Sequence, residues 1–175
     1  MYWILLVMAF LFSIVIAVVV GGLVTPRKHT ASRAIVLPNS PLEKVWDLIR
    51  SVANYPDWRD DIQSVTVAEQ NGQTTWTETG RQGSISYIAA VSECPARFTA
   101  RITDEDLAYC GEWQYVLSAN NGGTRLIITE QGEVGNPVFR FFGAHFFGYT
   151  RTIDAYLRDL AMQLNEQAKP EPVSN

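Results

Sequence analysis

The first 26 residues contain no charged side chain, and this feature constrains the fold more than any other. Met1–Val24 is apolar except for Ser13, Gly21 and Gly22, which are tolerated in a helix surrounded by lipid. At 1.5 Å per residue, a helix of this length spans about 36 Å, more than the hydrocarbon core of a bilayer at about 30 Å. We therefore expect residues 1–24 to form one transmembrane helix.

A secretory signal peptide is the competing interpretation of this segment. It would carry a basic start, a shorter apolar core and a small-x-small cleavage site. No Lys or Arg precedes the apolar segment here, and the two glycines are followed by Leu23-Val24-Thr25-Pro26. The sequence favours a retained anchor.

The charges that flank the apolar segment predict its orientation. Arg27, Lys28 and Arg33 follow it, whereas the preceding side offers only the α-amino group. Basic flanks stay on the cytoplasmic side of a membrane. We expect a single-pass membrane protein whose C-terminal domain lies in the cytoplasm.

The other 149 residues hold all 14 Lys and Arg and all 18 Asp and Glu, so the net charge is −4. This balance argues against nucleic-acid binding, which needs a basic face. The length suits one domain. Cys94 and Cys110 form no C-x-x-C pair, and no second histidine stands at ligand spacing from His145. We expect no metal site, and the sequence has no phosphate-loop or dinucleotide motif that would imply a cofactor.

After a linker over residues 25–31, the domain is expected to cover residues 32–167. A strand over 32–38 precedes Ser40-Pro41-Leu42-Glu43, which reads as a capping box with Ser40 as the cap. The helix that follows carries Leu42, Val45, Trp46 and Ile49 on one face, as a core-facing amphipathic helix does.

From Ile62 the apolar pattern alternates with a period of two, which predicts strands. Asn71-Gly72 is a strong hairpin signal, and closely spaced strands imply an antiparallel meander. Residues 138–167 then show helical periodicity, which predicts one helix of about 30 residues. Residues 168–175 are expected to be a disordered tail. The predicted strands of the meander cover residues 62–70, 73–79, 84–93, 96–103, 111–119 and 124–131.

Two groups of residues carry a resemblance to a known family. The first is Pro41-x-x-x-Val45-Trp46-x-x-Ile49, followed by Asn54-Tyr55-Pro56-Asp57-Trp58. The second is Asn136-Pro137, followed by Ile153-Asp154-x-Tyr156-Leu157-x-x-Leu160. With them, residues 32–166 resemble the START-like superfamily, also called Bet v 1-like or the polyketide cyclase/dehydrase and lipid transport group. One departure is Arg50-Ser51, where many relatives place an Asp.

The resemblance implies an α+β helix-grip fold. A seven-stranded antiparallel sheet would wrap around a long C-terminal helix, with a largely apolar cavity between them and the transmembrane helix in front. It further implies binding of a hydrophobic small molecule, either a lipid or an isoprenoid-like compound. By fold position, the expected lining residues are Trp76, Tyr87, Trp113, Tyr115, Phe142, Phe146 and Tyr149.

Because this scaffold serves enzymes, carriers and binders, two other functions stay open. The first is a cyclase/dehydratase-type enzyme, with His145 and either Glu78 or Glu93 as the acid/base pair inside the cavity. The ordinary alternative leaves both glutamates on the solvent face and His145 on an exposed helix. The second is an interaction module whose interior is filled by its own side chains. Its aromatic run Phe139–Tyr149 would dock a membrane partner or touch lipid.

Overall fold

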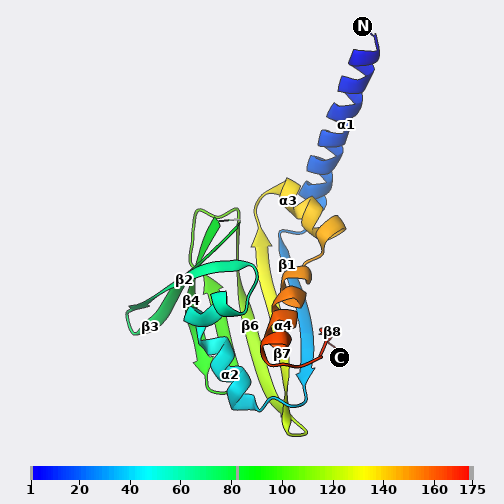
Figure 1. Cartoon of the computed structure of the whole chain (residues 1–175). Coiled ribbons are helices and arrows are strands. Elements are labelled where there is room, and N and C mark those ends of the chain that lie inside the picture. The colour runs from blue at the N-terminus through cyan, green and yellow to red at the C-terminus, as the bar shows by residue number, and fades with distance from the viewer. Residues whose placement is uncertain (1, 82, 174–175) are drawn as a thin grey trace.

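The structure is a computed structural model that describes residues 2–81 and 83–173. An N-terminal helix, α1 (Tyr2–Val24), projects away from an α+β domain (Figure 1). Among the described residues, α1 is the one helix long and apolar enough to cross a membrane, and its most apolar stretch is not buried against the rest of the chain.

The domain is built on one antiparallel sheet with the strand order β2-β3-β4-β5-β6-β7-β1-β8. The predicted α+β helix-grip fold is confirmed. The eighth strand is β8 (Glu171–Pro172), which pairs with Arg33 and Ala34 of β1. A disordered tail was expected for residues 168–175, but residues 171–172 pair in the sheet, and residues 174–175 lie outside the described residues. The other strands are β1 (Lys28–Leu37), β2 (Ile62–Gln70), β3 (Gln73–Gly80), β4 (Gly83–Glu93), β5 (Arg97–Ile102), β6 (Tyr109–Asn120) and β7 (Gly123–Val134).

Three helical elements cover one face of the sheet and enclose the core. They are α2 (Leu42–Arg50), the 3-10 helix η1 (Val52–Asp57) and α4 (Arg151–Gln163) (Figure 1). The predicted core positions of α2 are buried at Val45, Trp46 and Ile49. The buried face of α4 is formed by Ile153, Tyr156, Leu157, Leu160 and Ala161.

The tight turns follow the predicted hairpins. Asn71 and Gly72 both have positive φ, at 53° and 76°, as a type I′ turn requires. Asn121 and Gly122 repeat the arrangement between β6 and β7, with φ of 48° and 88°. The register of the meander is therefore set locally at two of its connections.

The single long helix predicted over residues 138–167 is wrong. The segment forms α3 (Pro137–Phe142), one π-helical turn η2 (Gly143–Phe147) and then, after a break, α4. At the break Gly148 has φ 69° and ψ 152°, a conformation that only glycine adopts readily. Helical periodicity runs through both halves of the segment, so it did not reveal the break. Of this segment, only α4, which has 13 residues, packs against the concave face of the sheet.

Two local predictions at the start of the domain also need correction. The sheet begins at Lys28 rather than at residue 32, because β1 pairs with β7 from Lys28↔Glu133 to Leu37↔Thr124. Ser40 does not cap α2. Its hydroxyl donates instead to Glu166 Oε1 at 3.0 Å, so it ties the end of α4 to the start of α2.

Candidate functional site

Four of the seven predicted lining residues lie together on the covered face of the sheet. Trp76 stacks on Tyr87 with ring centroids 5.4 Å apart, and Trp113 lies 6.2 Å from Tyr115. Phe98 joins the two pairs. Helical elements add three rings from the opposite side, and together these eight residues form what we call the aromatic cluster. Those three residues are Tyr55, Trp58 and Tyr156.

Two of the other three predicted lining residues lie elsewhere, because the C-terminal helix is broken, whereas the third, Tyr149, packs against the edge of the core. Phe142 and Phe146 belong to α3 and η2, and their rings lie 5.5 Å apart beside the end of α1. Tyr149 follows the break and stacks on His29, with centroids 3.7 Å apart and an interplanar angle of 12°.

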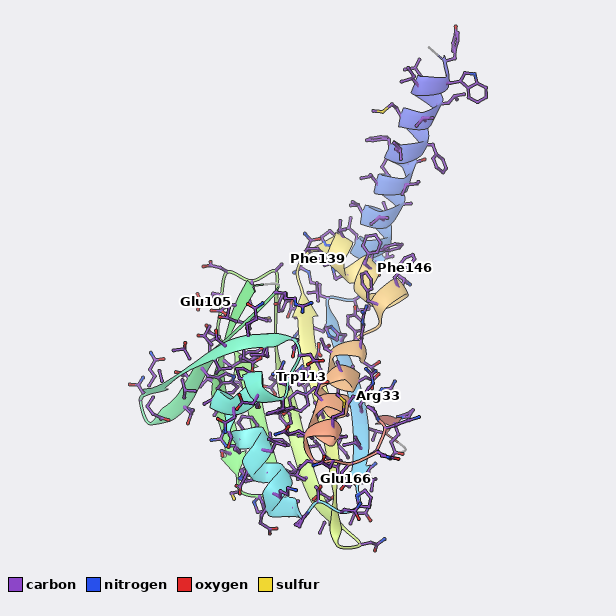
Figure 2. The ribbon with its side chains drawn as sticks, viewed as in Figure 1. Arg33, Glu105, Trp113, Phe139, Phe146 and Glu166 are labelled. Carbon is purple, nitrogen blue, oxygen red and sulfur yellow. The ribbon has the colours of Figure 1, made fainter. Side chains whose placement is uncertain are left out.

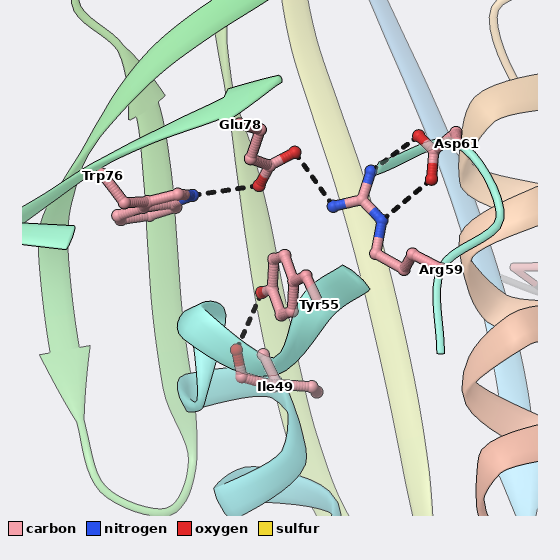
Figure 3. Close-up of polar contacts among 6 residues, drawn as sticks. All are labelled: Ile49, Tyr55, Arg59, Asp61, Trp76 and Glu78. Atoms are coloured by element: carbon pink, nitrogen blue, oxygen red, sulfur yellow. Dashed lines mark hydrogen bonds and ion pairs between the residues drawn. The ribbon is translucent and has the colours of Figure 1, made fainter. Parts of the chain in front are cut away.

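An ion pair lies inside the aromatic cluster (Figure 3). Glu78 is only 7% exposed. Its Oε2 accepts a hydrogen bond from Arg59 Nη1 at 3.0 Å, and its Oε1 accepts one from Trp76 Nε1 at 2.9 Å. Arg59 also donates to both carboxylate oxygens of Asp61. The solvent-face alternative for Glu78 is therefore wrong.

Arg59 is not among the candidate residues that the sequence analysis named. Burial disfavours the charged guanidinium, but the carboxylates of Glu78 and Asp61 outweigh that effect and raise the pKa of Arg59 above its ordinary value. Its guanidinium carbon lies 5.1 Å from the Tyr55 ring and 5.3 Å from the Tyr156 ring, within cation–π range. A permanent cation is thus held against the aromatic cluster.

The buried tyrosines of the cluster act as neutral hydrogen-bond donors. Burial raises the pKa of Tyr55, Tyr115 and Tyr156 well above the ordinary value. Tyr55 donates to the carbonyl of Ile49 at 2.8 Å. Trp58 Nε1 and the Tyr156 hydroxyl are buried, and neither donates a hydrogen bond of standard geometry among the described residues, although the Tyr156 oxygen interacts with the Tyr55 hydroxyl. Two donors are therefore left free inside the cluster.

A second polar group on the same face was also missed. His29 Nε2 lies 3.0 Å from Glu130 Oε1, and Trp113 Nε1 donates to Glu130 Oε2 at 3.0 Å. The sequence prediction started the domain at residue 32 and so treated His145 as its one histidine. Continuing the alternation of β1 back to Lys28 would have placed His29 on the covered face with Ala31.

The other two acid/base candidates do not join Glu78. A β-bulge at Ala90 shifts the pairing of β4 with β5 between Ala89 and Val91. A shift of one residue reverses the face of every later side chain, so Glu93 is exposed instead of sharing the face of Tyr87. His145 is exposed on η2 beside Phe141. The predicted acid/base pair is therefore not assembled.

Two surface hollows are found on the described part of the molecule, and neither lies between the sheet and α4. One, of about 240 Å³, lies on α1. The other, of about 480 Å³, lies where the end of α4 meets the end of β1. The described residues contain no group of three or more His, Cys, Asp or Glu placed to hold a metal ion. The aromatic cluster lies under α4, where Trp113 and Tyr115 contact Tyr156. The larger hollow is lined by Val36, Pro38, Asn39, Asn165, Glu166, Gln167 and Ala168.

Residues 28–164 match the sequence profile of a family described as polyketide cyclase / dehydrase and lipid transport. The chain belongs to this family. The match covers the whole sheet except β8, together with all helical elements of the domain. The sequence matches none of the curated proteins at a significant level.

Solved structures share the fold of this family member at low sequence identity. The Zhui aromatase/cyclase from Streptomyces sp. R1128 has a TM-score of 0.62 and 11% identity, covering 79% of this chain and 94% of that one. Truncated norcoclaurine synthase from Thalictrum flavum has a TM-score of 0.63 and 9% identity, covering 82% and 98%. A START superfamily protein from Mycobacterium smegmatis has 0.57 and 17%, covering 78% and 97%. Likeness at these identities establishes the fold and not an activity.

Proposed function

We propose that this chain is a membrane-tethered START-like domain that binds a hydrophobic small molecule within the aromatic cluster. The observation that carries the proposal is the pair of free donors, Tyr156 Oη and Trp58 Nε1, which are buried among aromatic rings and donate no hydrogen bond of standard geometry within the described chain. An unsatisfied buried donor costs about 1–3 kcal/mol. A ligand oxygen placed between them would remove that cost.

The chemistry of the cluster favours a particular kind of ligand. Stacked rings offer apolar surface, and the positive charge of Arg59 is already compensated by Glu78 and Asp61. An anionic ligand group would have to displace those carboxylates, whereas a carbonyl or hydroxyl oxygen needs only the free donors. We infer a lipid or isoprenoid-like molecule with a neutral oxygen at one end. Because the aromatic rings lie under α4, a ligand that binds among them requires α4 or the rings to move.

The tether is the second part of the proposal. α1 carries no charged residue and is not covered by the domain. Arg27, Lys28 and Arg33 follow it, which supports a cytoplasmic domain by the positive-inside rule. A domain held at the membrane meets a membrane-dissolved ligand at a raised effective concentration.

Native mass spectrometry of the full chain released from detergent micelles, with solvent extraction of the same sample, tests ligand binding. We expect a stoichiometric apolar adduct, and we expect Tyr156→Phe to carry less of it. Tyr109→Phe, at a partly exposed position at the start of β6, is the matched control and should retain it. A wild-type protein that carries no adduct and takes up neither added farnesol nor oleyl alcohol would overturn the proposal.

One observation favours a second candidate, a membrane-associated interaction module without a ligand. Aromatic side chains lie between the sheet and α4, while Phe139, Phe146 and Phe147 are exposed. The same experiment separates the two candidates, because an interaction module stays empty under every condition.

A further inference from the structure

The segment formed by α3 and η2 packs against the end of α1 rather than against the sheet's covered face. Two glycines allow this close approach. A Cβ at Gly22 would overlap the carbonyl of Pro137, and one at Gly21 would lie 2.7 Å from the Phe141 ring. The last turn of the apolar helix and the first turn of α3 are thus in backbone contact.

A buried arginine fastens the same junction. Arg140 is 4% exposed, and its Nη1 donates to the carbonyl of Thr25 at 3.1 Å. A cation at this position also offsets the negative end of the α1 dipole. Thr25 itself donates through Oγ1 to the carbonyl of Gly21 at 2.8 Å. The orientation of α3 relative to α1 is therefore fixed by packing and by hydrogen bonding.

This junction leaves three large side chains uncovered. Phe139, Phe146 and Phe147 are 58%, 67% and 60% exposed, and we call them the phenylalanine patch. Figure 2 shows Phe139 and Phe146 at the level where α1 ends. Residues 137–149 contain no acidic residue, and their one cationic side chain, Arg140, is buried. Leu23 and Val24, in the last turn of α1 that α3 packs against, are exposed as well.

We infer that the phenylalanine patch inserts into the interfacial layer of the same bilayer that α1 crosses. The inference rests on the proposed tether. Aromatic side chains concentrate at the membrane interface, and a short helical segment with an apolar face buries it at the boundary of head groups and acyl chains. Because the patch is fixed to the last turn of α1, it stays at that boundary whenever α1 spans the membrane.

The charges around the junction fit a lipid partner better than a protein one. Arg27 and Lys28 are exposed directly after α1, where they would meet anionic head groups. The phenylalanine patch lies at the end of a helix that would span the membrane, so lipid would cover the patch before a soluble protein could bind it. The domain is thereby attached at two points, so it has one orientation on the membrane instead of swinging on the short linker.

Collision accessibility of spin labels in the full chain tests the inference. The protein, with Cys94→Ser and Cys110→Ser, is reconstituted in nanodiscs of phosphatidylcholine and phosphatidylglycerol. Single labels replace Phe146 or Phe147, Phe10 in the middle of α1, or Asn121 in the distant β6–β7 turn. We expect the ratio of oxygen to nickel-chelate accessibility at 146 and 147 to be severalfold higher than at 121 and lower than at 10.

The labels at positions 10 and 121 distinguish a failure of the proposed tether from a failure of the patch inference. If the label at position 10 reports the bilayer while 146 and 147 match 121, the tether holds and the patch inference is overturned. If the label at position 10 also reports water, the tether itself fails and the patch inference fails with it. Substitution of these exposed phenylalanines leaves the buried core intact, so a folding defect does not confuse the comparison.

Discussion

The indole nitrogen of Trp76 donates to the carboxylate of Glu78, two residues further along the same strand, at 2.9 Å. Residues two apart on a strand share a face, so one short segment supplies both an aromatic wall and a buried charge. Arg59 completes the arrangement from the loop after η1. The charge inside the aromatic cluster is therefore fixed by local strand geometry plus one distant arginine.

Removing the buried carboxylate should destabilise the fold. We expect Glu78→Gln to cost about 3 kcal/mol, because losing one partner of a buried ion pair leaves the other charge uncompensated. Asp61 still contacts Arg59 and limits the loss. The measurement is thermal unfolding in detergent followed by near-UV circular dichroism. Glu93→Gln on the exposed outer face is the control, with an expected change within about 0.5 kcal/mol. Equal effects of the two substitutions would contradict a buried role for Glu78.

Two tyrosine-to-phenylalanine substitutions should have different effects on the free energy of unfolding of the ligand-free protein. Tyr55→Phe removes the hydrogen bond to Ile49 and should cost about 1 kcal/mol. Tyr156→Phe removes a hydroxyl that donates no hydrogen bond of standard geometry and interacts only with the Tyr55 hydroxyl, so the free energy of unfolding should stay unchanged or rise. Both are read in the same unfolding experiment after delipidation. A loss at Tyr156 as large as that at Tyr55 would show that its hydroxyl is already satisfied.

Asp159 makes stability depend on pH. Partial burial and the neighbouring Asp60 raise the pKa of its carboxyl, whereas the unfolded chain keeps the ordinary value of about 3.9. A carboxyl whose pKa is raised by folding destabilises the fold when it is charged, and the penalty disappears as pH falls through the raised pKa.

We therefore expect Asp159→Asn to raise the melting temperature at neutral pH, with the gain vanishing below about pH 4. In an Asp60→Asn background the gain should shrink, because Asp60 is part of the cause. Melting temperatures from pH 3.5 to 7.5 measure this. A gain that is constant across the range would mean that the effect of the substitution is not electrostatic.

The break before α4 requires glycine. Gly148→Ala should cost about 1–3 kcal/mol, because a side chain at φ 69° and ψ 152° is strained. Gly135→Ala is the matched control, since its φ is not positive and the nearest atom to an added Cβ lies 3.5 Å away. Unfolding of both variants under the same conditions tests this. A tolerant Gly148 would mean that η2 and α4 can join as one helix.

The sheet and the first helix were predictable because their signals are local. Alternation, the Asn71-Gly72 turn and the amphipathic face of α2 each depend on neighbouring residues. The break at Gly148 was not predictable in this way, since it depends on α3 packing against α1. Periodicity alone carries no information about a partner 115 residues away, such as Thr25 for Arg140.

The site was predicted only in part. Trp76, Tyr87, Trp113 and Tyr115 were expected from their fold positions in the family that the sequence resembles. Strand alternation then keeps such residues on one face until a bulge intervenes. The bulge at Ala90 places Glu93 on the opposite face of the sheet from the one that strict alternation predicts. The neighbouring residues give no sequence signal for a bulge. Arg59 contacts Glu78 from a loop that contains both acidic and basic residues. Such a composition predicts that the side chains of the loop are exposed to solvent.

The order of α1 and β1 along the chain determines how the domain bears force. β1 starts four residues after α1 ends, and it pairs antiparallel with β7 over ten residue pairs. A force pulling on α1 would therefore act along β1, parallel to the strand. The hydrogen bonds between β1 and β7 would then be sheared together instead of breaking one after another.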